Sequence, residues 1–224
     1  MHFVRPRRWT LWLLSLVVIT WGCLIAPAAQ AHPHVWVTMN TELLYEPDGL
    51  ALGLRQDWTF DDMFSAYATT GIAAKIKGQF TREELQSLAQ TNVESLKDYA
   101  YFTYPTIDGK KQKNAFNDPI DYWLSYDPKA TVLTLHFTML FKTPVKAKVL
   151  KIEIYDPEFF VDFGFAEKNA VKLVGAPASC ALWTEKPPDE NFLSSQNVKQ
   201  ALIPSEANIG MGMDFANKIL VECR

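Results

Sequence analysis

Apolar and polar residues alternate along residues 35–45, and the same period of two returns across residues 50–58. Alternation of this kind predicts β-strands with one buried face. The sequence Glu-Pro-Asp-Gly at 46–49 lies between the two stretches and is typical of a tight turn. We therefore expect a hairpin near the start of the folded chain. The same criteria predict further strands at 99–104, 120–126, 131–141, 149–155, 171–174, 180–183 and 219–223.

Two helices are predicted between the second and third strands. Asp61 can cap a short helix that extends to residue 67, because its carboxylate can accept a backbone N–H of the first turn. Thr81 and Glu84 form a capping-box pair that opens a helix to about residue 96. Residues 189–217 are polar and are expected to be partly helical. The predicted class is α+β, strand-rich, with sheet packed on sheet and a helix–loop–helix insertion.

Residues 1–31 have the order of a secretory signal peptide. Three arginines precede an apolar stretch from residue 9 to about residue 25, and Ala29 and Ala31 form a small-residue cleavage site. The alternatives are an uncleaved membrane anchor and a lipid-modified Cys23. The cleavage site disfavours the first, and the absence of a leucine shortly before Cys23 disfavours the second. We expect residues 32–224 to remain as a single periplasmic domain.

Removal of the signal leaves an acidic chain with two cysteines. The signal contains three of the 22 basic residues and none of the 25 acidic ones. Acidic residues therefore outnumber basic ones in the remaining chain, which lacks the excess of positive charge typical of nucleic-acid binding. No later apolar run is long enough to span a membrane. Cys180 and Cys223 form an even pair, which in an oxidising periplasm usually becomes a disulfide. A pair of metal-binding thiols is the less favoured alternative.

The expected mature N-terminus, His32-Pro33-His34, is the strongest candidate for a binding site. A terminal amine has a pKa of about 8, so it can lose its proton near neutral pH. The amine and imidazole of His32 can then chelate one transition-metal ion. Pro33 has no amide N–H, which blocks the chelate that uses a deprotonated second amide. We therefore expect His32 to chelate and His34 to assist. The competing interpretation is a frayed terminus whose histidines have no function.

Further ligands for such an ion have to come from elsewhere in the chain. Asp61 lies near the end of the strand expected to pair with the one after His34, although it can equally serve only as a helix cap. His136 is the remaining histidine, and a hydrogen-bonded surface histidine is its competing interpretation. Met211 and Met213 form a soft-metal pair that more often serves packing.

Two kinds of site are disfavoured. Gly78 and Glu84 have the spacing of positions six and twelve of an EF-hand loop, but Lys75 and Lys77 occupy the third and fifth positions, where oxygen ligands belong. We therefore expect no calcium at this degenerate loop. The sequence also lacks a Gly-x-Ser-x-Gly elbow, a His-Glu-x-x-His motif and a Gly-rich phosphate loop. We accordingly expect that the protein is not an enzyme.

An ordered series of segments resembles a bacterial periplasmic family. The segments lie at 31–37 (Ala-His-Pro-His-Val-Trp-Val), 58–65, 102–104, 134–137, 155–163 and 215–223. The series resembles the domain-of-unknown-function family labelled "ABC-type uncharacterised transport system, periplasmic component". Its members tend to be encoded beside, or fused to, nickel/cobalt permeases of the NicO type. Many carry an acidic EF-hand-like loop, from which this chain departs.

The resemblance implies a periplasmic accessory protein of divalent transition-metal transport, with an inner-membrane metal permease as partner. Together with the terminal histidines, it predicts binding of nickel, cobalt, zinc or copper by His32 and His34, with His136 and Asp61 as further ligands. One alternative is a metal-free module that docks on the permease. Another is a copper enzyme that uses His32 as a histidine brace.

Overall fold

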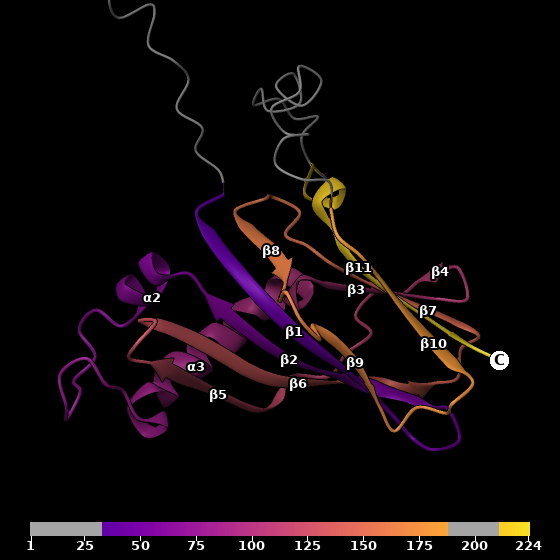
Figure 1. Ribbon diagram of the computed structural model, residues 1–224, viewed down its shortest axis with the longest axis horizontal. Coiled ribbons are helices and arrows are strands. Elements are labelled where there is room, and N and C mark those ends of the chain that lie inside the picture. The colour runs from indigo at the N-terminus through magenta and orange to yellow at the C-terminus, as the bar shows by residue number, and fades with distance from the viewer. Residues whose placement is uncertain (1–32, 188–210) are drawn as a thin grey trace, which may run out of the picture. The chain divides into compact units, whose positions relative to one another are not determined.

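The computed structural model describes residues 33–187 and 211–224, which all belong to one compact unit, His32–Arg224. The described residues form two β-sheets and two α-helices (Figure 1). The predicted signal peptide, His32 and most of the polar stretch 189–217 lie outside the described residues. Among the residues described, no helix is long and apolar enough to span a membrane.

The first sheet has six strands in the order β5-β6-β2-β1-β8, with β9 also paired to β1. The predicted hairpin is confirmed, since β1 and β2 are antiparallel and place Val37 opposite Phe60. By contrast, β8 and β9 run parallel to β1, and β8 was not predicted. The strands are β1 (Val35–Tyr45), β2 (Ala51–Phe60), β5 (Ile120–Asp127), β6 (Val132–Val145), β8 (Val161–Phe165) and β9 (Val171–Val174).

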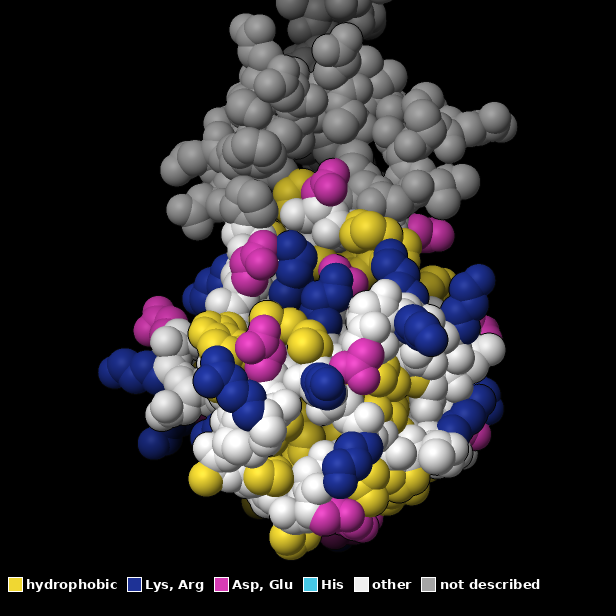
Figure 2. Space-filling model, turned by 90° about the vertical axis from the view of Figure 1, so that its right-hand side faces the viewer, with side chains coloured by type: hydrophobic (Ala, Val, Ile, Leu, Met, Phe, Trp, Pro, Cys, Tyr) yellow, Lys and Arg dark blue, Asp and Glu magenta, His cyan; other side chains and the backbone are white. Residues whose placement is uncertain are grey.

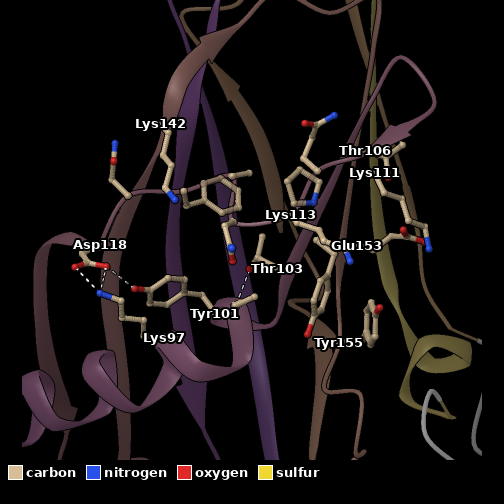
Figure 3. A pocket seen from close by; sticks show the side chains of 18 residues that line it. Lys97, Tyr101, Thr103, Thr106, Lys111, Lys113, Asp118, Lys142, Glu153 and Tyr155 are labelled. Carbon is tan, nitrogen blue, oxygen red and sulfur yellow. Dashed lines mark hydrogen bonds and ion pairs between the residues drawn. The ribbon is translucent and has the colours of Figure 1, made fainter.

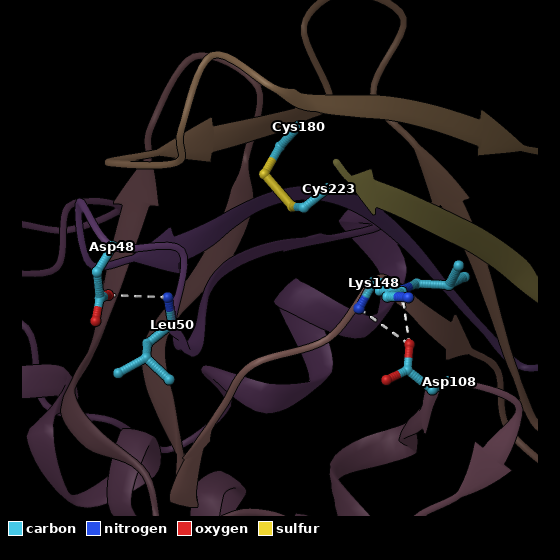
Figure 4. Close-up of a disulfide and its surroundings, with 7 residues drawn as sticks. Asp48, Leu50, Asp108, Lys148, Cys180 and Cys223 are labelled. Atoms are coloured by element: carbon cyan, nitrogen blue, oxygen red, sulfur yellow. Dashed lines mark hydrogen bonds between the residues drawn. A yellow bond between two sulfur atoms is a disulfide. The ribbon is translucent and has the colours of Figure 1, made fainter.

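The second sheet has five strands in the order β10-β11-β7-β3-β4. They are β3 (Thr103–Ile107), β4 (Lys110–Lys111), β7 (Val149–Ile154), β10 (Cys180–Glu185) and β11 (Asn217–Cys223). The predicted disulfide is confirmed: Cys180 and Cys223 are opposite each other on β10 and β11 and are bonded (Figure 4). A disulfide fits an extracytoplasmic location.

One apolar core joins the two sheets. It buries Met39 and Trp58 from the first sheet together with Ile152 and Ile219 from the second, and the Trp58 ring meets Phe163 edge-on, with centroids 4.9 Å apart. A polar link adds to this packing: the buried amide of Asn217 on β11 donates a hydrogen bond to the carbonyl of Phe163 on β8. The predicted α+β class is confirmed.

Both predicted helices and their caps are present as α2 (Asp62–Ala68) and α3 (Arg82–Leu96). Thr81 and Glu84 form the reciprocal capping box, with N···O distances of 3.3 and 2.9 Å. The second carboxylate oxygen of Glu84 accepts the N–H of Lys75 at 2.9 Å. The acidic side chain at the end of the EF-hand-like loop is therefore bonded to backbone through both oxygens.

The strand predicted at 99–104 is present, but its start was placed too early. Residues Lys97–Phe102 form a 3-10 segment, η1, and the strand begins only at Thr103. Ala100, Tyr101 and Phe102 have φ angles of 52°, 52° and 49°, a left-handed conformation that costs roughly 1–2 kcal/mol per residue. The reversal buries Tyr101 and Phe102 in the core, which explains why an apolar stretch resembled a strand. A second 3-10 segment, η3 (Met211–Phe215), precedes β11.

Candidate functional site

His34 is fixed by its backbone at the start of the first sheet. Its N–H donates to the carbonyl of Phe160 at 2.9 Å, and the N–H of Val35 approaches the same oxygen at 3.3 Å. The imidazole packs against the Phe160 ring, with centroids 4.8 Å apart. The backbone at residue 34 is therefore fixed to the turn that precedes β8.

The carboxylate of Asp156 shapes the turn that presents the Phe160 carbonyl. One of its oxygens accepts the N–H of Glu158 at 2.9 Å, and the other accepts the N–H groups of Phe160 and Val161 at 3.0 Å each. The residue is almost fully buried. Three backbone amides thus converge on one carboxylate, and these bonds fix the position to which His34 is attached.

The segment before β11 packs against the turn formed around Asp156. Phe215 stacks on Phe159 with ring centroids 4.3 Å apart. Gly212 lies so close that a Cβ atom there would be 1.7 Å from the carbonyl oxygen of Asp156, so this position requires glycine. The anchor of His34 therefore depends on residues near both ends of the described chain.

Asp61 joins the start of β1 to the start of α2. Its carboxylate accepts the N–H of Trp36 at 2.9 Å through one oxygen and the N–H of Phe64 at 2.8 Å through the other. In return, the Asp61 N–H donates to the carbonyl of Trp36 at 3.0 Å. The predicted helix cap is confirmed. An ion bound here would share oxygens that already accept backbone hydrogen bonds.

These side chains belong to one exposed surface, which we call the terminal patch: His34, Trp36, Asp61, Phe160 and Asp162. Trp36 alternates with buried neighbours on β1 and is paired with Asp162 on the parallel strand β8. Trp36 is 42% exposed and Phe160 is 45% exposed. The patch thus combines an imidazole, two carboxylates and two aromatic rings.

His136 belongs to a different cluster on the same sheet. Its Nδ1 lies 2.6 Å from Asp57 Oδ1, and its Nε2 lies 2.8 Å from Ser125 Oγ. The ring stacks on Trp123 at a centroid distance of 3.9 Å, and the guanidinium of Arg82 lies 4.7 Å from the centre of the Trp123 ring. Both imidazole nitrogens therefore have protein partners.

The strand register separates this cluster from the terminal patch. His136 is opposite Asp57, and Asp57 is opposite Asn40 on β1. Asn40 is six residues beyond His34, which corresponds to about 20 Å of extended strand. An ion held by His34 would therefore draw its other ligands from the terminal patch or from the residues before it, and not from His136.

No group of three His, Cys, Asp or Glu side chains in the described part of the chain is arranged to hold a metal ion. His34, Asp61 and Asp162 supply the nitrogen and oxygen donors at the terminal patch, and His32 lies outside the described residues. The imidazole suits nickel, copper or zinc. Sequence reasoning missed Phe160 as the anchor and Asp162 as a neighbour. The signal that pointed toward them was the segment 155–163, although its pairing partner could not be inferred.

Comparison with known proteins places the chain in an established family. The family described as "Protein of unknown function (DUF1007)" matches residues 17–223. A Haemophilus influenzae protein described as "Uncharacterized protein" is 25% identical over 208 residues, which cover 90% of this chain and 96% of that protein. Among solved structures, the acetylcholine-binding protein type 1 of Biomphalaria glabrata covers 89% of each chain at 9% identity, with a TM-score of 0.32, which is too low to indicate a common fold.

Proposed function

The chain belongs to the DUF1007 family, and from its residues and from the resemblance to the periplasmic transport-associated family we propose that it is a periplasmic accessory protein of divalent transition-metal transport. In this proposal it binds nickel, cobalt, zinc or copper at its mature N-terminus and serves an inner-membrane metal permease. The ligands are the terminal amine and imidazole of His32, assisted by His34. The ion is cargo of the transport system.

The observation that carries the proposal is the anchored backbone of His34. A chelate formed by flexible residues loses conformational entropy when it closes on an ion, and an ordered ligand reduces that cost. Residue 32 lies only two positions before this anchor. The carboxylates of Asp61 and Asp162 add negative charge beside it, which favours a cation. The disulfide between Cys180 and Cys223 agrees with a periplasmic location.

Native mass spectrometry tests the proposal on protein purified from the periplasm. We expect a mass that begins at His32 and a stoichiometry of one ion after addition of Ni(II), Co(II), Zn(II) or Cu(II). An extra Met before His32 should abolish tight binding, because the amine is then displaced from the imidazole. His34→Ala should weaken binding. His136→Ala is the matched control and should bind as the unchanged protein does.

Two results would contradict the proposal. The first is absence of binding to the mature protein at micromolar metal. The second is equal loss of metal from the His34 and His136 variants, because it would place the ion away from the terminal patch or indicate general destabilisation. Thermal unfolding of each variant separates these two explanations.

A metal-free docking module is the second candidate, and the exposed aromatic rings of the terminal patch favour it. On the neighbouring helix α2, Met63 and Tyr67 are 69% and 79% exposed, and their spacing of four places them on one face. Exposed apolar side chains of this size are common at docking surfaces. If docking is the function, Trp36→Ala should release the protein from its membrane partner, while His34→Ala should leave the association intact.

A further inference from the structure

A cavity of about 800 Å³ lies between η1, β3, β7 and the segment 112–118. Figure 3 shows Lys142 on one side of it and Lys111 on the other. Its volume is in the range of pockets that enclose small organic molecules. None of the residues of the terminal patch lines it, so it is independent of the proposed metal site. We call it the lysine cavity.

Positive charge predominates in the lysine cavity. Four lysines line it, against the two carboxylates of Asp118 and Glu153, and both carboxylates have cationic partners. Asp118 pairs with Lys97 at 2.8 Å, and Glu153 pairs with Lys151 at 3.1 Å. The other three lysines have no ion pair among the described residues, and they are Lys111, Lys113 and Lys142.

Aromatic side chains form the walls between these lysines. Tyr104 and Tyr155 stack with centroids 4.5 Å apart, and Phe116 stacks on Phe141 at 4.7 Å. Burial raises the pKa of Tyr104 to about 12, and its protonated hydroxyl donates to the carbonyl of Tyr99 at 3.3 Å. The cavity therefore offers flat apolar surface together with ammonium donors.

The left-handed turn at Ala100 and Tyr101 forms part of the cavity wall. Its backbone conformation is unfavourable for every residue except glycine. Backbone strain of this kind often occurs at ligand sites. The turn places the Tyr101 hydroxyl 3.3 Å from Asp118. This contact and the ion pair with Lys97 engage both oxygens of the Asp118 carboxylate at the rim.

We propose that the lysine cavity binds a small organic anion. Lys111, Lys113 and Lys142 would hold its carboxylate or phosphate group through charge-assisted hydrogen bonds, and its apolar body would pack on Tyr104, Tyr155 and Phe116. The same chemistry describes a free metabolite and the headgroup of an anionic lipid. Figure 2 shows Lys and Arg side chains, with Asp and Glu among them, spread over the face that lies on the side of β4 and the C-terminus in Figure 1.

Calorimetry with inorganic phosphate and phenyl phosphate tests the site on the mature protein. Phenyl phosphate should bind about tenfold or more tightly than inorganic phosphate, because its ring is buried against the tyrosines. The triple variant Lys111→Ala, Lys113→Ala, Lys142→Ala should lose about tenfold or more of that affinity. All three lysines are exposed, so the variant should keep its fold, which thermal unfolding checks. Lys142→Glu provides a second, single-residue variant.

The matched control replaces Lys129, Lys168 and Lys172, which lie outside the cavity, by Ala with the same change in net charge. It should retain binding. Flotation with phosphatidylglycerol and phosphatidylcholine vesicles separates the two sources of the anion: binding only to phosphatidylglycerol, lost in the cavity triple variant, identifies a lipid headgroup. Absence of binding to every anionic probe, or equal loss in both triple variants, would overturn the proposal. Neither result bears on metal binding at His32.

Discussion

The terminal patch and the lysine cavity present opposite chemistry on one folded unit. The patch presents the imidazole of His34 and the carboxylates of Asp61 and Asp162, which suit a cation. The cavity presents ammonium groups between aromatic walls, which suit an anion. Their construction differs as well: backbone hydrogen bonds fix the patch at the start of a strand, whereas a left-handed turn shapes the cavity. Side chains of a site can therefore be positioned either by regular strand pairing or by a strained local turn.

Loss of the disulfide tests whether the two regions share one cooperative unit. The double variant Cys180→Ser, Cys223→Ser should lower the free energy of unfolding by about 3–4 kcal/mol, because an unfolded chain of that loop length gains conformational freedom. Urea unfolding followed by tryptophan fluorescence and by circular dichroism should give coincident transitions. Separate transitions would show that the two sheets, and the regions they carry, unfold independently.

Replacement of Asp156 should distinguish the two regions. Asp156→Ala leaves three backbone N–H groups without their acceptor, and we expect a loss of about 2–3 kcal/mol in unfolding free energy. The turn then no longer fixes the Phe160 carbonyl, so metal affinity at His34 should fall while phenyl phosphate affinity at the lysine cavity is retained. Denaturant unfolding and calorimetry measure the two effects. Asp162→Asn serves as the comparison, since it removes a neighbouring charge and leaves the turn bonded.

The smallest expected effect concerns the rim of the lysine cavity. The Lys97 hydrogen bond lowers the pKa of Asp118, so the ionised pair stabilises the folded state above the unfolded pKa of this group. That contribution is lost as the pH falls through the lowered folded pKa. Lys97→Ala should move the Asp118 pKa back toward its ordinary value, as measured by NMR titration of its carboxyl carbon. An unchanged titration would remove Lys97 as the partner.

The sequence predicted those elements that depend only on residues close together in the chain. The hairpin at 35–58 follows from alternation and a turn, and α3 follows from the capping box of Thr81 and Glu84. The left-handed turn escaped prediction because its side chains are apolar and carry none of the glycines that usually mark such a conformation. The disulfide was predictable because only two cysteines remain after residue 31.

Neither region could be assembled from the sequence, because its parts meet only through pairing of distant strands. Phe160 meets His34 only because β8 lies parallel to β1, and parallel pairing leaves no hairpin signal. The lysines of the cavity are spread from residue 97 to residue 142 and have no common spacing. His136 was identified as a candidate ligand, but its position relative to His34 depends on the register of three strands.

The position of β1 in the first sheet also affects how the chain folds. This strand is the first to be made, yet one of its edges is completed only by β8 and β9, and Val35 pairs with Val161. Contacts of such long sequence separation slow folding. Until residues 161–174 are available, that edge presents unpaired N–H and C=O groups beside apolar side chains, a surface on which strands of other chains can add. Before β8 and β9 pair with β1, this edge therefore favours aggregation, and a chaperone that covers β1 during that time should raise the yield of folded protein.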